Sequence, residues 1–258
     1  MKRLRLQSLP PPRGVAKRKA DKSGYICPGI GAVPGVTTVL SKTSAGKERL
    51  EQWLKRPDAQ SISDAAKARG TWTHSCIEGW IEAHAAQEPL PDFRHFAFGG
   101  YWHSAKGWLQ QHWAQKVALE QPVYHASGFA GSFDAIGYAD YGNEPDALTL
   151  FDWKTSKNAR DETLVRDYFD QLGAYSYCIE YVYGVKPERG VLMIARPRQE
   201  PDVWELSRAE LDDATERFLE RLKRYYAMPP DPAGPESSLI SSTPRNRFLP
   251  PFPLASEK

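Results

Sequence analysis

The sequence lacks the features that mark disulfide-stabilised, zinc-stabilised and membrane-spanning proteins. Its three cysteines are widely scattered, odd in number and form no CxxC pair, so we expect neither a disulfide framework nor a structural zinc site. No run of about 18 apolar residues occurs, so we expect no membrane span. The first residues hold no apolar stretch of the kind found in secretory signals. We therefore expect a reducing compartment: the cytoplasm, or the host cytoplasm if the chain is phage-encoded, rather than the mitochondrial matrix.

The sequence also carries little net charge, only +2 from 34 basic and 32 acidic residues. The whole molecule is not a polycation, so a nucleic-acid surface has to come from local segregation of charge. Residues 1–24 show such segregation, because Met1 to Lys22 contain eight Lys and Arg against one acid, Asp21. This composition predicts a flexible basic arm that either contacts phosphates or is a solvated tail.

Proline is concentrated at the other end, where residues 228–258 contain eight prolines and predict an irregular Pro-rich tail. Between the two ends we expect one domain, residues 25–227, with a helical layer over 25–116 and an α/β core over 117–227. Hydrophobic periodicity predicts helices and strands in an order typical of the α/β class. The predicted helices are 36–40, 47–55, 58–87, 100–116, 162–183 and 211–226, and the predicted strands are 117–125, 128–140, 148–155, 191–195 and 203–206.

Two of these strands place charged residues among apolar ones. Asp134 lies in Gly-Ser-Phe-Asp-Ala-Ile-Gly, and Asp152 and Lys154 lie in Leu-Phe-Asp-Trp-Lys-Thr-Ser. Because strand side chains alternate, Asp152 and Lys154 share a face, and Asp134 joins them if the two strands are neighbours. Buried carboxylates need a compensating cation or proton, and Mg²⁺ or Mn²⁺ prefers oxygen ligands. The alternative is an ordinary ion pair at a strand end, since Asp-x-Lys by itself is common.

Two helices add polar residues at one-turn spacing. His74 and Glu78 share a side of the 58–87 helix, where the imidazole is either a metal ligand with a polar neighbour or a hydrogen-bonded core histidine. Gln171 and Tyr175 offer an amide and a phenol on one edge of the 162–183 helix, suited to a phosphate or sugar contact unless Tyr175 is simply core. The other five histidines have no comparable arrangement of neighbouring polar residues, and we expect structural roles for them.

Taken together, these motifs resemble the RecB-like branch of the PD-(D/E)XK nucleases. The shared order is Gly-x-x-x-His on a helix, Glu before a strand pair, Gly-x-x-Asp, Asp-x-Lys-Thr and then Gln-x-x-x-Tyr. The branch includes the mitochondrial genome maintenance exonuclease and related phage and bacterial exonucleases, and the resemblance runs from about residue 36 to residue 195. It implies a restriction-endonuclease-like fold, in which a mixed central sheet is flanked by helices below an N-terminal helical layer.

The resemblance also implies roles for individual residues. His74, Asp134 and Asp152 would ligate Mg²⁺ or Mn²⁺, helped by the backbone carbonyl of Trp153, and Lys154 would be the catalytic lysine. Glu120 matches an acid that precedes the core strands and takes a supporting role. Gln171 and Tyr175 would hold the DNA strand. Apart from the resemblance, basic residues close to these motifs, Arg69 and Lys157 among them, are placed to line a channel for DNA.

The implied activity is hydrolysis of DNA phosphodiester bonds, with a preference for a free, single-stranded end. A structure-specific or restriction-type endonuclease, or a catalytically inactive nucleic-acid-binding protein, remains an alternative. Some RecB-like nucleases bind an iron–sulfur cluster through four cysteines; this chain has too few, so no cluster is expected. No Walker motif occurs, so a helicase or recombination partner would be a separate chain. Tryptophans lie in the helical layer at positions 53, 72, 102, 108 and 113; most should be core, and some can stack on unpaired bases.

Overall fold

A five-stranded sheet forms the central layer of the protein. The computed structural model describes residues 5–21, 23–46, 52–140, 146–160 and 162–229. The strand order is β10-β9-β8-β7-β4, where only β8 and β9 run parallel and the other neighbours are antiparallel. The bounds are β4 Trp113–Leu119, β7 Ala135–Ala139, β8 Thr149–Thr155, β9 Arg189–Ala195 and β10 Asp202–Ser207. The sheet is therefore mixed, and β8 is its central strand.

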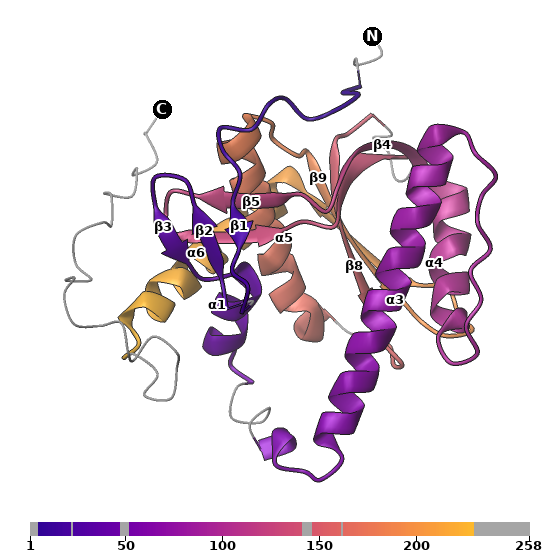
Figure 1. Cartoon of the computed structure of the whole chain (residues 1–258), viewed down its shortest axis with the longest axis horizontal. Helices are drawn as coiled ribbons and strands as arrows, with labels where there is room; N and C mark the ends of the chain where they lie inside the picture. The colour runs from indigo at the N-terminus through magenta and orange to yellow at the C-terminus, as the bar shows by residue number, and fades with distance from the viewer. Residues whose placement is uncertain (1–4, 22, 47–51, 141–145, 161, 230–258) are drawn as a thin grey trace.

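Helices cover both faces of this sheet (Figure 1). One face packs against α5 Glu162–Tyr183 and α6 Arg208–Ala227, on which α1 Val36–Thr43 lies, and the other packs against α3 Ala59–Ala86 and α4 Gly99–His112. Side chains of β8 alternate between the two cores: Leu150 faces the α5 side, while Phe151 and Trp153 face the α3 side. This arrangement confirms the predicted α/β class. Among the described residues, no helix is both long and apolar enough to cross a membrane.

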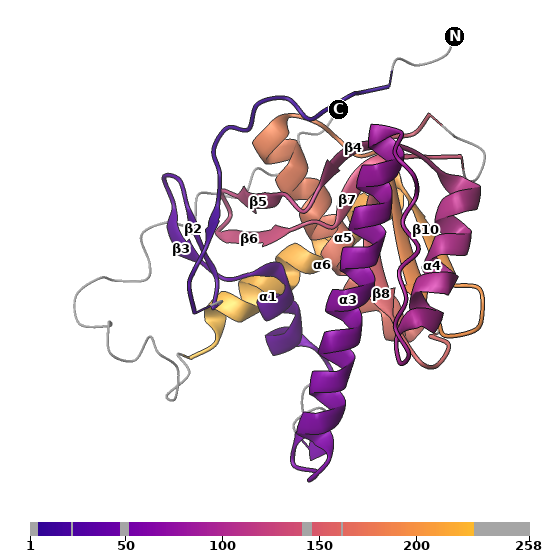
Figure 2. The same ribbon diagram turned by 45° about the vertical axis from the view of Figure 1, so that its right-hand side comes forward.

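Two smaller sheets extend the α5 side of the molecule. β5 Pro122–His125 and β6 Phe129–Ser132 form an antiparallel hairpin, and Gly128 adopts a φ of 91° in its turn, a conformation that favours glycine. β1 Lys17–Arg18, β2 Tyr25–Cys27 and β3 Gly31–Val33 form the second sheet. Figure 2 shows both sheets beside α5 and α6, away from α3 and α4.

The predicted boundaries were wrong between the helical layer and the sheet. Residues 113–116, predicted to end a helix, instead begin β4, because the edge of β7 offers them backbone partners such as Lys116↔Gly137. Gly137 permits this close approach, since a Cβ there would lie 2.4 Å from the carbonyl oxygen of Gln115. The strand predicted over 117–125 divides into β4 and β5 at Glu120, which has a φ of 47°. The strand predicted over 128–140 divides into β6 and β7 at Asp134.

Some predictions fall on residues that the structure does not describe. Residues 47–51 of the predicted 47–55 helix and residues 230–258 of the Pro-rich tail lie outside the described ranges. The predicted helix over 162–183 matches α5 residue for residue, and the backbone N–H of Gly184, whose φ is 67°, closes it with a 2.9 Å bond to the carbonyl of Glu180.

The basic segment at the start of the chain differs from the expected flexible arm. Residues 5–21 lie against the domain, where the backbone N–H of Arg13 donates to Val182 O (2.9 Å) and that of Leu6 donates to Tyr138 Oη (2.8 Å). Ala16 is only 2% exposed. The composition of the segment does not predict these contacts. They depend on its few apolar residues, which pack on the core, and on its backbone, which finds hydrogen-bond partners there.

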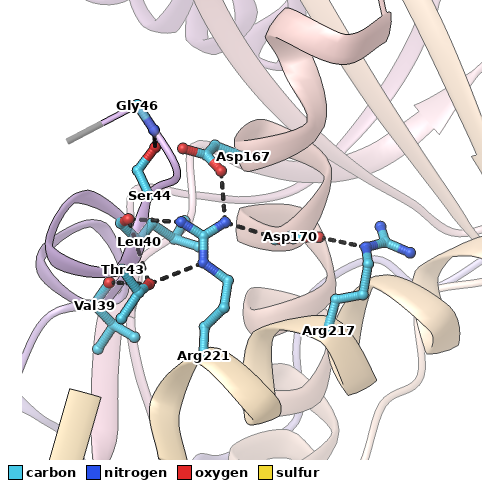
Figure 3. Close-up of polar contacts among 9 residues, drawn as sticks. All are labelled: Val39, Leu40, Thr43, Ser44, Gly46, Asp167, Asp170, Arg217 and Arg221. Atoms are coloured by element: carbon cyan, nitrogen blue, oxygen red, sulfur yellow. Dashed lines mark hydrogen bonds and ion pairs between the residues drawn. The ribbon is translucent and has the colours of Figure 1, made fainter. Parts of the chain in front are cut away.

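A buried arginine on α6 joins three helices (Figure 3). Arg221, 6% exposed, donates from Nη2 to the carbonyl of Leu40 (2.6 Å) and from Nε to Thr43 Oγ1 (2.9 Å), both on α1. Its Nη1 contacts Asp167 (2.5 Å) and Asp170 (3.0 Å) of α5. The guanidinium thus satisfies the carbonyl of Leu40 and the hydroxyl of Thr43 near the end of α1 and pairs with the buried carboxylate of Asp170, which fixes α1, α5 and α6 relative to one another.

The hairpin contains a histidine that makes stability depend on pH. The His125 ring stacks on Tyr177 of α5 with centroids 4.0 Å apart, and burial lowers the pKa of His125 to about 4 from its usual 6.5. The unfolded chain then binds more protons between these values, so stability falls as the pH drops from about 6.5 towards 4. We expect a weaker pH dependence of the free energy of unfolding in His125→Gln over this interval. Urea titrations of both proteins at each pH measure it, and equal slopes would contradict it.

Candidate functional site

The central strand β8 presents a buried acid and a lysine on one face. Asp152 is fully buried, and its Oδ2 forms an ion pair with Lys154 Nζ, whose side chain is 22% exposed. Burial raises the pKa of Asp152 to about 6, although the charge of Lys154 opposes the rise. Burial works in the opposite direction on Lys154, but the carboxylates of Asp152 and Asp134 prevail and raise the pKa of its ammonium. The predicted alternation therefore places Asp152 and Lys154 together.

Asp134 reaches this strand from the break between β6 and β7. Its Oδ2 accepts a 2.7 Å hydrogen bond from the backbone N–H of Trp153, the residue between Asp152 and Lys154. The break matters because Asp134 is released from the ladder positions of β6 and β7, so that its carboxylate turns towards β8. The continuous strand predicted over 128–140 did not contain this break.

His74 approaches the same backbone from α3, on the other side of the sheet. Its Nε2 lies 2.7 Å from the carbonyl oxygen of Trp153, and its Nδ1 lies 3.8 Å from Asp134 Oδ2. A carbonyl can only accept, so Nε2 carries the hydrogen and a neutral ring turns the lone pair of Nδ1 towards the carboxylate. Two acceptors that face each other require a proton or a cation between them. The carbonyl of Trp153, expected to contact a metal, here accepts from His74.

Gln171 and Tyr175 of α5 support Asp152 from behind. Gln171 Nε2 donates to Asp152 Oδ1 (3.0 Å) and lies 3.3 Å from Tyr175 Oη, and both side chains are buried. Burial is the main cause that raises the pKa of Tyr175 well above its usual value. Gly131 makes room for this tyrosine, since a Cβ there would lie 2.5 Å from Tyr175 Cε1. In this structure Gln171 orients the buried acid, and the predicted contact of the pair with a DNA strand stays a prediction.

A second group of ligand-type atoms lies beside His74. Ligand atoms of His74, Glu78 and Glu120 lie within 4.8 Å of one another, so these three residues could hold a metal ion. Burial, the largest cause, and then the carboxylates of Asp134 and Glu78 raise the pKa of Glu120 to about 8, although the residue as a whole is exposed. Burial also raises the pKa of Glu78, against the influence of His74. Sequence reasoning noted Glu78 only as a neighbour of His74, and the one-turn spacing was the signal.

The two predicted basic contacts differ in their surroundings. Arg69 of α3 donates from Nε to Thr155 Oγ1 (3.0 Å), directly after Lys154, and its guanidinium lies 5.0 Å from the ring centroid of Tyr101. Lys157 is exposed in the segment that follows β8. Arg69 is therefore built into the edge of the site, whereas Lys157 lies on the surface beyond it.

No family model and no curated protein matches this sequence. Among solved structures, the crystal structure of SSO0001 is 13% identical, with a TM-score of 0.34 over 72% of this chain and 74% of that chain. The structure of Scheffersomyces stipitis Rai1 in complex with (3'-NADP)+ and calcium ion is 16% identical, with a TM-score of 0.22 over 58% of this chain and 48% of that chain. Neither likeness is close enough to carry an argument about function.

Proposed function

We propose that this protein is a metal-dependent DNA nuclease of the PD-(D/E)XK type, which hydrolyses phosphodiester bonds and prefers single-stranded ends. The observation that carries the proposal is the convergence on one backbone segment of β8. His74 contacts the carbonyl of Trp153, Asp134 accepts from its N–H, and Asp152 and Lys154 flank it. Three separate elements thus bring an imidazole, two carboxylates and an ammonium together.

The donor set fits a divalent cation. His74 Nδ1 and Asp134 Oδ2 face each other at 3.8 Å, and a cation between them would satisfy both acceptors. Burial raises the pKa of Asp152 against the charge of Lys154, and a further cation beside this carboxylate would favour its charged form. Carboxylate oxygens with one imidazole suit Mg²⁺ or Mn²⁺, which His74, Asp134 and Asp152 would hold. When bound, such an ion supplies an activated water and neutralises charge on a phosphate.

The surrounding residues have tasks of their own in this proposal. Lys154, paired with Asp152 and partly exposed, stabilises negative charge that develops on the scissile phosphate. Gln171 keeps the Asp152 carboxylate in one orientation through its 3.0 Å bond. Glu120 takes a supporting role beside Glu78.

Linear and circular single-stranded DNA separate the possible activities. We expect the protein with Mg²⁺ or Mn²⁺ to degrade a linear single strand and to leave a circular strand of the same sequence intact, because an exonuclease requires an end. Gel electrophoresis of both substrates over time measures this. Equal digestion of the circle would contradict the exonuclease proposal in favour of an endonuclease, and binding without cleavage of either strand would indicate a nucleic-acid-binding protein.

A further inference from the structure

A turn between α3 and α4 presents an aromatic side chain directly to solvent. Phe96 has an exposed fraction of 103%, so its ring gains nothing from burial. The turn itself is well held: His95 Nδ1 accepts from the backbone N–H groups of Ala97 and Phe98, both at 3.1 Å, and the N–H of Gly99 donates to the carbonyl of His95 (2.8 Å). Phe96 therefore projects from a hydrogen-bonded turn.

The rings around this turn form a stacked set. The His95 ring lies nearly parallel to Phe98, with centroids 4.4 Å apart at 7°, and to Phe96, at 5.2 Å and 14°. Trp72 of α3 packs against His95 at 5.2 Å and against Phe98 at 6.3 Å. We call Trp72, His95, Phe96 and Phe98 the aromatic platform. Its inner rings are partly buried, and Phe96 is its exposed end.

The platform is continuous with the proposed active site. Trp72 lies three residues after Arg69 on α3, so both lie on one side of the helix. Arg69 contacts Thr155, next to Lys154, and covers the ring of Tyr101, whose backbone N–H donates to the carbonyl of Phe98 (2.9 Å).

Charge at the junction favours an anionic occupant. Arg94, two residues before Phe96, and Lys106 of α4 both pair with Asp92. Arg69 differs from them, because within the described ranges no carboxylate forms an ion pair with it. Arg69 lies between Lys154 and the aromatic platform. This arrangement would allow Arg69 to bind a phosphate of a nucleic-acid strand while the platform contacts the adjoining base.

We propose that the aromatic platform stacks an unpaired nucleobase of the strand whose phosphate lies between Arg69 and Lys154. The inference rests on the proposed nuclease function and adds a base-binding position to it. Aromatic stacking accepts every base, so this position discriminates strand state rather than sequence. A paired base is already stacked within its duplex, so the platform selects single strands. A protein partner would cover Phe96 but would leave Arg69 without its anion.

Binding of two oligonucleotides tests the proposal. A single-stranded oligonucleotide and an abasic oligonucleotide of equal length carry the same phosphates, and a metal chelator prevents cleavage during fluorescence anisotropy titrations. We expect Phe96→Ala to weaken binding of the base-containing strand by about 5-fold to 100-fold and to leave abasic binding unchanged. Arg69→Ala should weaken both alike. Phe96→Trp should restore binding, and the new indole should lose fluorescence when the base-containing strand binds.

The chain offers a matched control in the same connection. Leu90 is also an exposed apolar residue, 43% exposed, but lies outside the platform, so Leu90→Ala should bind both oligonucleotides like the wild type. Since Phe96 is fully exposed, equal melting temperatures should exclude a folding defect. Unchanged binding by Phe96→Ala, or an equal loss of affinity for both oligonucleotides, would contradict the proposed base-binding position. Cleavage by the wild type would in that case still support the proposed nuclease function. A wild type that binds neither oligonucleotide would overturn both.

Discussion

Asp152→Asn is expected to lower the rate of DNA cleavage by on the order of 10³-fold, because the amide removes a charged ligand from the proposed metal site. The substitution keeps the shape of the side chain, so its bond with Gln171 at Oδ1 can persist. Metal affinity should fall with the rate. Titration calorimetry with Mn²⁺ measures the metal affinity, and degradation of a labelled single strand measures the cleavage rate.

Lys154→Ala should lower the same rate by on the order of 10²-fold to 10³-fold through loss of charge stabilisation. A matched control is Lys186→Ala, which removes an exposed lysine before β9, at the opposite end of the sheet from Lys154. The control should cleave DNA at the wild-type rate. Full activity in purified, folded Asp152→Asn or Lys154→Ala would refute the assigned site.

Arg221→Met is expected to cause the largest loss of stability. It removes the more deeply buried of the two arginines paired with Asp170, and it takes from the carbonyl of Leu40 on α1 the 2.6 Å hydrogen bond that Arg221 donates. Breaking a buried ion pair from one side costs about 3–5 kcal/mol, a large part of the total of about 5–15 kcal/mol that holds a domain together. Urea unfolding followed by circular dichroism measures the change.

The neighbouring arginine supplies the comparison. Arg217 contacts Asp170 at 2.8 Å, but its side chain is 35% exposed, so Arg217→Met should cost only about 1 kcal/mol. Adding Asp170→Asn to Arg221→Met should cost less than the sum of the two single substitutions, since both remove the same interaction. Strict additivity, or equal losses from Arg221→Met and Arg217→Met, would contradict the role of this network.

Sequence reasoning succeeded where periodicity is local. Alternation along β8 correctly placed Asp152 and Lys154 on one face, and the apolar pattern correctly gave the bounds of α5. It failed where tertiary partners decide conformation. Trp113 to Lys116 continue a helical pattern, but pairing with β7 draws them into the sheet.

The candidate site shows the same division. One-turn spacing brought His74 near Glu78 and Gln171 near Tyr175, but spacing does not show which way a helix face points. The hydrogen bond from Gln171 to Asp152, for example, was not predicted. The approach of Glu120 to His74 depends on the break between β4 and β5, and the stacking of His95 depends on a turn between helices. Neither has a periodic signal in the sequence.

The continuity of α3 has a mechanical consequence. The helix runs for 28 residues without interruption, about 42 Å, and its first turns project away from the sheet while its second half carries His74 (Figures 1 and 2). Ser61, exposed on the projecting part, lies roughly 20 Å from His74 along the axis. Because a continuous helix moves as a stiff rod, a tilt of α3 near His74 displaces its first turns by a larger distance than it displaces the imidazole. A fluorophore attached at Ser61 would therefore report movements of α3 near His74 without occupying the candidate site.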